Sequence, residues 1–319
     1  MARYGLTIPL DRIPLGEQRE AIRRLREVGY EDLWSAEVGQ YDAFTPLILA
    51  NEWEPTFNLG TAIVPAFTRG PATMAMSAAA LAELAPGRFY LGIGSSSDVI
   101  VSKWNASEFV RPYYKTRDIA RFLREAFEGG KVDRKFDTFE ISGFRLAQPP
   151  TVPPKILIAA LRPQMLAMAG RESDGAIINW LSPADVAKVV PFVGENKEIV
   201  ARIFVAPGVE RNLLLDAGRR AIAAYLNVGV YADFHRWLGR GEALEQMWRL
   251  WDSGDRKGAL AAIPEEIVDQ LIVSGTPSQC KARIAEYFGA GVDVAALAVL
   301  PFGIDTYEAA LSLAPGSSE

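Results

Sequence analysis

Two apolar segments in the first third of the chain each end in small residues and hydroxyls, residue types that suit the binding of a flat organic ligand. The segments read N-L-G-T-A-I-V-P from Asn58 and G-R-F-Y-L-G-I-G-S-S-S from Gly87. In the second segment, Gly92 and Gly94 would let the backbone approach a ring closely, and Ser95 offers a hydroxyl to its polar edge. The two glycines do not make a dinucleotide-binding fingerprint, because the third glycine is missing; a tight turn is the alternative interpretation.

A run of small residues later in the chain predicts an anion site. Ala159, Ala160, Leu161 and Arg162 lead from an apolar segment to Pro163, which suits the first position of a helix. Free backbone N–H groups at such a helix start bind phosphate groups. Arg162 could supplement those amides, but it could equally block the pocket or be a solvated charge.

Three further side chains at the ends of apolar segments are candidates for a site. Asn179 could hydrogen-bond a ligand, and Trp180 could either wall a pocket or pack under a loop. Glu37 is the best candidate for a catalytic acid or base, because a carboxyl group beside an apolar ring can have its proton affinity raised. An ion pair or a solvated position at the rim is the alternative for Glu37.

The elements that must position these residues alternate regularly along the chain. Eight strands are predicted, at Tyr4–Pro9, Leu33–Glu37, Leu59–Val64, Phe89–Gly94, Lys155–Ala160, Ala176–Trp180, Arg202–Val205 and Val292–Leu300. A strand followed by a helix, repeated about eight times, is the α/β pattern of a TIM (β/α)8 barrel. A doubly wound sheet is disfavoured because no G-x-G-x-x-G follows the first strand. We therefore expect the candidate residues to meet at the rim formed by the carboxyl ends of the strands.

The chain is predicted to be one domain spanning residues 1–319, with two insertions in the barrel pattern. A hairpin is expected at about residues 130–150, after the fourth strand, where apolar and polar residues alternate. A helical segment is expected at about residues 213–273, after the seventh strand, because the helical pattern there is longer than one crossover needs. It contains His235, which could contact a substrate or be packed in a helix.

The composition excludes several classes of protein. A net charge of −5 without a basic run argues against nucleic-acid binding. One histidine, His235, and one cysteine, Cys280, make a metal site improbable. The apolar run at the start is too short for a signal peptide, and no segment approaches ~20 uninterrupted apolar residues. We expect a cytoplasmic protein with a small-molecule substrate, without a metal, nucleic-acid or membrane partner.

Five segments, in the same order along nearly the whole chain, resemble the bacterial luciferase-like superfamily, and most closely its deazaflavin-dependent branch, which includes methylenetetrahydromethanopterin reductase. They are L-G-T-A-I-V-P-A-F-T-R-G-P (59–71), G-R-F-Y-L-G-I-G (87–94), K-W-N (103–105), K-I-L-I-A-A-L-R-P-Q-M-L-A-M-A-G (155–170) and D-G-A-I-I-N-W-L-S-P (174–183). The resemblance implies a homodimer that binds coenzyme F420 and transfers a hydride between that cofactor and an organic substrate. Monooxygenases that use flavin mononucleotide (FMN) share the fold, so FMN is the alternative cofactor. A non-catalytic flavin- or deazaflavin-binding protein is the alternative function.

The resemblance also assigns roles to particular residues. In similar proteins the strand that matches Thr61, Ala62 and Ile63 carries a bulge with a non-proline cis peptide under the central ring, here at Ala62–Ile63; an ordinary strand is the alternative. Several relatives have a histidine after the glutamate that matches Glu37, whereas this chain has Val38. Mechanisms that use that histidine are therefore doubtful here, and the substrate is not predicted.

Overall fold

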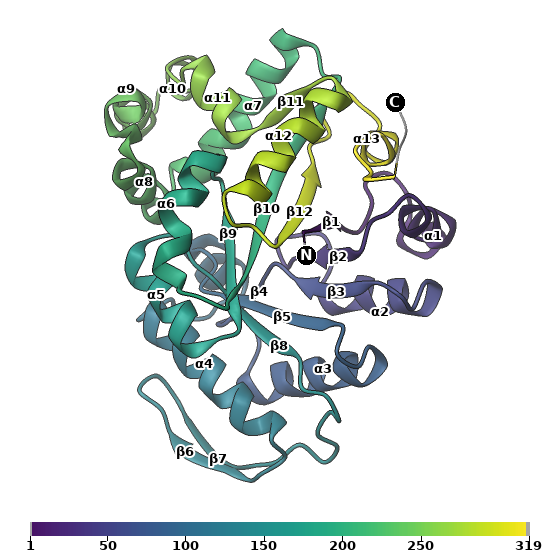
Figure 1. The fold of residues 1–319 in the computed structure, drawn as a ribbon. Coiled ribbons are helices and arrows are strands. Elements are labelled where there is room, and N and C mark those ends of the chain that lie inside the picture. The colour runs from purple at the N-terminus through teal and green to yellow at the C-terminus, as the bar shows by residue number, and fades with distance from the viewer. Residues whose placement is uncertain (1, 317–319) are drawn as a thin grey trace.

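The computed structural model describes residues 2–316, and its centre is a closed parallel barrel (Figure 1). Around the barrel the strands follow the order β12-β1-β2-β3-β5-β8-β9-β10, and β10 pairs with β12 to close the ring. Their bounds are β1 (Arg3–Thr7), β2 (Asp32–Ser35), β3 (Asn58–Thr61), β5 (Phe89–Gly94), β8 (Lys155–Ala159), β9 (Gly175–Asn179), β10 (Glu198–Pro207) and β12 (Val294–Val299). The predicted TIM barrel is confirmed.

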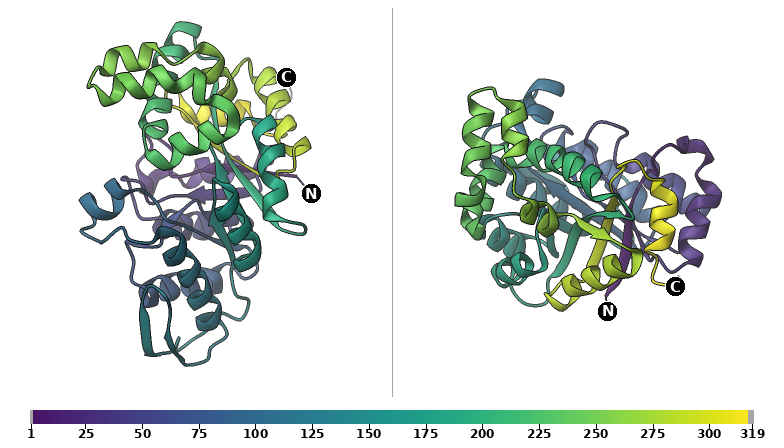
Figure 2. Two further views of the ribbon diagram at one scale, coloured as in Figure 1. Left: turned by 90° about the vertical axis from the view of Figure 1, so that its left-hand side faces the viewer. Right: turned by 90° about the horizontal axis from the view of Figure 1, so that it is seen from above.

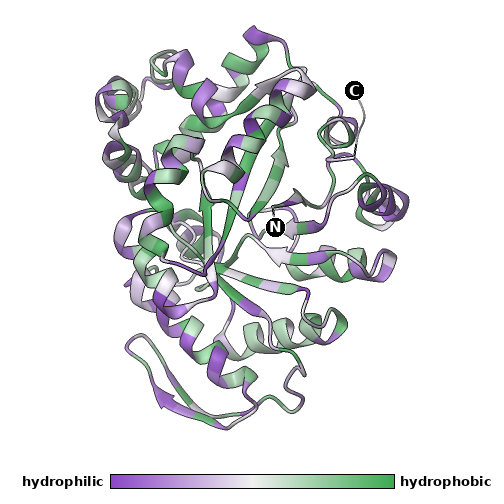
Figure 3. Ribbon diagram, in the orientation of Figure 1, coloured by the Kyte–Doolittle hydropathy of each residue, from purple (hydrophilic) through white to green (hydrophobic). Residues whose placement is uncertain are grey.

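Helices surround the barrel, and proline sets where several of them begin. The helices that follow barrel strands are α1 (Arg19–Glu27), α2 (Phe44–Trp53), α3 (Pro71–Leu84), α4 (Pro112–Phe127), α5 (Pro163–Glu172), α6 (Pro183–Val193) and α13 (Thr306–Ser312), and α12 (Pro277–Gly289) precedes the last strand. Proline occupies the first helical position of α3, α4, α5, α6 and α12, where its missing N–H costs no hydrogen bond. Figure 3 shows the hydrophobic residues concentrated on the strands and the hydrophilic residues on outward faces such as that of α1.

Both predicted insertions are present. β6 (Val132–Lys135) and β7 (Glu140–Phe144) form an antiparallel hairpin. The inserted helices are α7 (Arg211–Leu226), α8 (Gly229–His235), α9 (Gly241–Asp252), α10 (Arg256–Ala261) and α11 (Glu265–Leu271), and a short strand, β11 (Val273–Gly275), then pairs with β10. Figures 1 and 2 show the hairpin and the inserted helices, in green, at opposite ends of the molecule.

The predicted strands differ from the observed ones by one or two residues at most ends, and two of them differ more. The apolar pattern predicted the third strand as Leu59–Val64, with a bulge at Ala62–Ile63 implied by the resemblance; β3 ends at Thr61, and β4 (Val64–Pro65) resumes the pairing with β5. The seventh was predicted as Arg202–Val205, but β10 is longer and begins at Glu198. The strand begins with the charged residue Glu198, which does not fit an apolar strand pattern, because its side chain faces polar partners at the end of the barrel.

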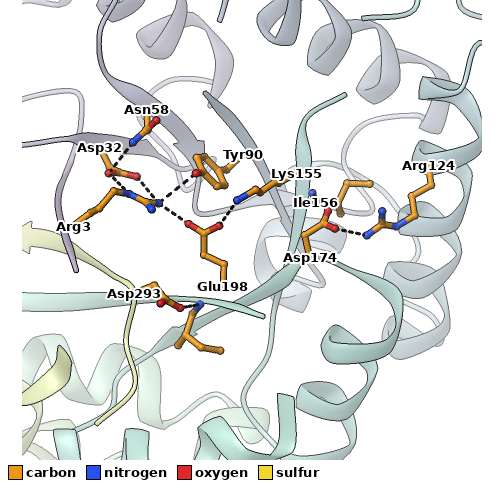
Figure 4. A network of polar contacts seen from close by, with 11 residues as sticks. Arg3, Asp32, Asn58, Tyr90, Arg124, Lys155, Ile156, Asp174, Glu198 and Asp293 are labelled. Carbon is orange, nitrogen blue, oxygen red and sulfur yellow. Dashed lines mark hydrogen bonds and ion pairs between the residues drawn. The ribbon is translucent and has the colours of Figure 1, made fainter. Parts of the chain in front are cut away.

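Those partners form an ionic network at the amino ends of the strands (Figure 4). Arg3 contacts Asp32 (Nε to Oδ2, 3.0 Å) and Glu198 (Nη2 to Oε1, 2.5 Å), and Lys155 Nζ lies 2.9 Å from Glu198 Oε2. Burial raises the pKa of Asp32 to about 6, although the Arg3 guanidinium opposes that shift. In barrels of this type the amino end serves stability, so the opposite end is where a site is expected.

Candidate functional site

The carboxyl end of the barrel, hereafter called the mouth, lies above a filled interior. Trp34, Tyr90, Leu157, Ile177 and Val200 are buried inside the barrel, each on a different strand. Side chains alternate in direction along a strand. The next inward position toward the carboxyl end therefore lies two residues after each of these buried residues. Those positions include Ala36, Ala159, Asn179 and Arg202, and all four are half-buried. Two small side chains, Ala36 and Ala159, and two polar ones, Asn179 and Arg202, therefore border the mouth.

The interruption between β3 and β4 lies at this mouth. The peptide bond Ala62–Ile63 is cis, as the resemblance predicts. Ala62 N donates to Ser35 O at 2.6 Å, and Glu37 N donates to Ile63 O at 3.1 Å. Ala62 and Ile63 are both half-buried and pack on the interior cluster, so this main chain forms part of the wall of the mouth.

Thr61 and Gly92 have a different role from the one predicted. Thr61 is fully buried; its hydroxyl donates to Gly92 O and accepts from Gly92 N, both at 2.8 Å. A Cβ on Gly92 would lie 1.9 Å from Thr61 O and 2.4 Å from Ile177 Cδ1. The absence of a side chain at Gly92 therefore lets the neighbouring strand approach, and neither residue is open to a ligand.

Gly94 is buried at the end of β5, and Ser95 follows it at the rim. A Cβ on Gly94 would lie 2.9 Å from Ala159 Cβ and 3.3 Å from Ile63 Cδ1, so this glycine makes room for two residues of the wall. Ser95 is half-buried just past the end of β5. Its hydroxyl has no hydrogen-bond partner within residues 2–316, which keeps it available to a ligand.

Glu37 is held in an ion pair, the alternative that the sequence left open. Arg69 donates to Glu37 Oε1 from Nε at 2.8 Å and from Nη2 at 2.6 Å, and the guanidinium lies over the Phe44 ring, 4.9 Å from its centroid. Only 15% of the Glu37 side chain is exposed. Because the guanidinium donates twice to the same oxygen, it fixes the position of this carboxylate at the edge of the barrel.

The predicted anion site follows β8. Ala159 and Leu161 are half-buried, whereas Ala160 is buried and turned away from solvent. Arg162 is exposed, and its Nη1 lies 3.3 Å from Asp233 Oδ2 of α8. No side chain caps the start of α5, so its first N–H groups remain available.

Trp180 does not wall the mouth. Its side chain is buried and stacks on Phe204, with ring centroids 4.0 Å apart, and it also packs against Tyr225. These contacts place it in the core between the barrel and the inserted helices, which is the packed alternative. Sequence alone does not show which helix covers the end of β9.

The polar side chains near the end of β9 include one that sequence reasoning missed. Asn179 Nδ2 donates to the hydroxyl of Tyr231 at 3.3 Å, and Asn179 Oδ1 is buried without a partner. Arg202 faces Asn179 in the β9–β10 register, and its Nε is also buried without a partner. The signal in the sequence was an arginine inside the apolar run I-V-A-R-I-F-V, at an inward position of a strand.

His235 is packed in the protein and does not reach the mouth. The ring is fully buried, and neither nitrogen has a hydrogen-bond partner. Burial, assisted by the nearby Arg240 charge, lowers the pKa of His235 to about 3. The histidine is therefore neutral and structural, as the packed alternative holds.

Two further features bear on the class of protein. Within the described residues, no group of three or more His, Cys, Asp or Glu side chains is placed to hold a metal ion. Among the helices of residues 2–316, none combines the length and the apolar character that crossing a membrane requires.

Comparison with known proteins agrees with this architecture. The luciferase-like monooxygenase family matches residues 3–294. The 5,10-methylenetetrahydromethanopterin reductase of Methanolobus tindarius is 24% identical over 289 residues, covering 83% of this chain and 84% of its own. The F420-dependent glucose-6-phosphate dehydrogenase of Amycolatopsis mediterranei is 25% identical over 291 residues, covering 85% of this chain and 84% of its own.

A solved structure has the same fold. The coenzyme F420-dependent tetrahydromethanopterin reductase of Methanopyrus kandleri aligns with a TM-score of 0.79 at 19% identity, covering 99% of this chain and 98% of its own. The family match extends from the first barrel strand to the last, and this chain therefore belongs to the luciferase-like monooxygenase family.

Proposed function

We propose that the protein is an oxidoreductase that binds coenzyme F420 at the mouth of the barrel and transfers a hydride between the deazaflavin ring and a small organic substrate. The observation that carries this proposal is the change of side-chain size along the barrel axis. Large side chains such as Trp34 and Tyr90 fill the interior, whereas the small side chains of Ala36, Ala62 and Ala159 border part of the mouth. A flat ring fits against small side chains and an exposed stretch of main chain.

The comparisons support the choice of cofactor class. The glucose-6-phosphate dehydrogenase and the solved reductase are both named as F420-dependent proteins. Their different substrates explain why the substrate of this chain does not follow from them.

Particular residues would hold the cofactor. The main chain of Ala62 and Ile63 would support one face of the ring, and the Ser95 hydroxyl would bond its polar edge. The loop from Ala159 to Arg162 and the uncapped start of α5 would bind the phosphate of the tail. The cofactor supplies the ring carbon that gives or accepts the hydride.

The chain's own contribution is then to position the reactants and exclude water. Trp34 fills the barrel axis below the mouth, where it lies against Gly5 and Gly60, and so closes the floor. The ion pair of Glu37 and Arg69 fixes the edge of the mouth beside Ile63, because the backbone of Glu37 also bonds that residue. Such positioning supplies most of what a direct hydride transfer requires.

A titration of the purified protein tests the proposal. F420 and FMN are added separately, and binding is followed by calorimetry and by the absorbance of each cofactor. We expect saturable binding of F420 and none of FMN at the same concentration. Binding of FMN alone would assign the chain to the flavin monooxygenases, and binding of neither would refute the proposal.

A matched pair of variants locates the bound cofactor. Ala159→Leu fills the mouth, whereas Ala167→Leu adds the same volume on α5 outside the barrel. We expect Ala159→Leu to weaken F420 binding about tenfold or more, because overpacking a ring site costs about 1–3 kcal/mol. Ala167→Leu should leave the affinity unchanged.

A further inference from the structure

Arg202 on β10 differs from the other arginines that are at least partly buried. Arg3, Arg69 and Arg240 each pair with a carboxylate, and Arg219 donates from Nε to Ile263 O at 2.9 Å. The side chain of Arg202 makes no hydrogen bond or ion pair within residues 2–316. It contacts the Phe204 ring, whose centroid lies 5.2 Å from the guanidinium carbon. A half-buried cation without an anion is unfavourable for folding, so its retention points to binding.

The neighbouring strand presents a complementary group. Asn179 faces Arg202 in the parallel register, and both side chains point inward, because Ile177 and Val200 two residues earlier fill the barrel interior. Asn179 Oδ1 is buried without a donor, and its Nδ2 donates to the Tyr231 hydroxyl at 3.3 Å. The two neighbouring strands therefore present a cationic donor, Arg202 Nε, and a neutral acceptor, Asn179 Oδ1, neither of which has a partner.

Tyr231, on α8, does not supply the missing negative charge. Burial raises the pKa of Tyr231 to about 12, so its phenol is neutral at ordinary pH. No carboxylate of residues 2–316 pairs with Arg202, so its guanidinium is available to an anionic ligand.

The position of these groups in the barrel indicates which ligand. The order β3-β5-β8-β9-β10 runs one way around the barrel, and β3-β2-β1-β12-β10 runs the other way. β10 is four strands from β3 in both directions, so Arg202 lies across the mouth from the Ala62–Ile63 main chain. A ring supported at Ala62 and Ile63 would leave the Arg202 side for the substrate.

We propose that Arg202, Asn179 and Tyr231 bind the carboxylate end of an acidic substrate, one that carries a hydroxyl or amino group beside the carboxylate. The guanidinium binds the carboxylate, and the adjacent donor satisfies Asn179 Oδ1. This inference rests on the proposed function for the location of the ring, but the recognition of the acid is a property of this chain alone.

Three matched probes test the recognition without the cofactor. Mandelate carries both groups, phenylacetate lacks the hydroxyl, and mandelamide lacks the charge. Binding is measured by calorimetry and by the shift of the thermal unfolding midpoint. We expect mandelate to bind best, mandelamide to bind about 10- to 100-fold more weakly, and phenylacetate to lie between them. Equal behaviour of mandelate and mandelamide would overturn the proposal.

Variants assign the effect to the named residues. Arg202→Met should abolish the preference for mandelate over mandelamide, and Arg202→Lys should restore part of it. Because Arg202 is unpaired in the free protein, Arg202→Met should also raise the unfolding midpoint. Arg219→Met is the matched control, since it removes an arginine that has a partner, and it should lower the midpoint. If Arg202→Met lowers the unfolding midpoint and leaves the preference for mandelate over mandelamide unchanged, Arg202 stabilises the fold and does not bind the acid.

A carboxylate placed inside the protein provides a further check. Asn179→Asp sets an acidic group opposite Arg202, so it should raise the unfolding midpoint and abolish mandelate binding. Unchanged mandelate binding in this variant would contradict the facing arrangement on which the proposal depends.

Titration of F420 separates this inference from the proposed function. If Arg202 serves the substrate, Arg202→Met should change the F420 affinity by less than about threefold. Loss of F420 binding with mandelate binding retained would assign Arg202 to the cofactor, overturning the inference and leaving the proposed function intact. If the wild-type protein recognises mandelate but binds no F420, the proposed function is refuted and the recognition of the acid by Arg202 and Asn179 still stands.

Discussion

At Gly92, the backbone of β5 lies close against the backbone of β3 beneath the mouth. The carbonyl oxygen of Thr61 occupies the place where a side chain would begin, and backbone atoms there cannot move aside cheaply. We expect Gly92→Ala to lower the free energy of unfolding by about 3 kcal/mol or more, because the added carbon forces the strands apart. Urea denaturation measures this change. Gly289→Ala is the control, since nothing lies within 4 Å of the added carbon, and it should be neutral or slightly stabilising.

The pair of Glu37 and Arg69 should behave as one unit. Both hydrogen bonds from the guanidinium end on the same carboxylate oxygen, and the two side chains are mostly buried. A double-mutant cycle of Glu37→Gln and Arg69→Met should therefore show a coupling free energy of about 1–2 kcal/mol in chemical denaturation. Additive effects would mean that the pair does not stabilise the rim.

His235 should make the protein sensitive to acid. Its pKa is about 3 in the folded protein and about 6.5 when unfolded, so the unfolded state binds more protons between those values. Stability is thus fully present above pH 6.5 and is lost as the pH falls toward 3, by at most about 1.4 kcal/mol per pH unit.

His235→Phe should remove that part of the pH dependence. The comparison with wild type is needed because Asp32, whose pKa is raised to about 6, changes stability in the opposite direction over the same pH range. Denaturation at pH 7 and pH 5 checks the difference, and identical slopes for both proteins would contradict the prediction.

At the scale of elements, the inserted helices share a second core with one side of the barrel. Trp180, at the end of β9, stacks on Phe204 of β10 and packs against Tyr225 of α7, which joins the insertion to the barrel. We expect Trp180→Ala to cost about 3–5 kcal/mol of unfolding free energy, because it leaves a cavity at this junction. Trp104→Ala, at a side chain that is 61% exposed, should cost little. Similar losses from the two substitutions would argue against a shared core.

Hydrophobic periodicity and proline positions predicted most of the elements, and the misses have physical causes. β5 was predicted with its observed bounds, since both faces of that strand are apolar. The apolar pattern runs through residues 59–64 because their composition suits a strand throughout. The break after β3 depends on two hydrogen bonds between elements, from Ala62 N to Ser35 O and from Glu37 N to Ile63 O.

At the scale of the whole molecule, α2 and α3 present apolar side chains to the outside. Ile48, Met76 and Leu84 are all exposed, with Met76 and Leu84 each about half accessible. We expect the protein to be a homodimer that covers this surface, in keeping with the family resemblance. Light scattering after size-exclusion chromatography measures the mass, and Met76→Glu with Leu84→Asp should shift it to that of a monomer. A monomeric wild type would refute this expectation.

The amino-acid sequence by itself determined the barrel, the two insertions and the family, because apolar periodicity, proline at helix starts and short motifs are local properties. Only the tertiary structure decided which candidates border the mouth. The ion pair of Glu37 with Arg69, the burial of Trp180 under α7 and the unpaired Arg202 beside Asn179 each depend on contacts or register between separate elements. Such pairings depend on how strands and helices pack in space, and the local pattern of residues along the sequence does not specify that packing.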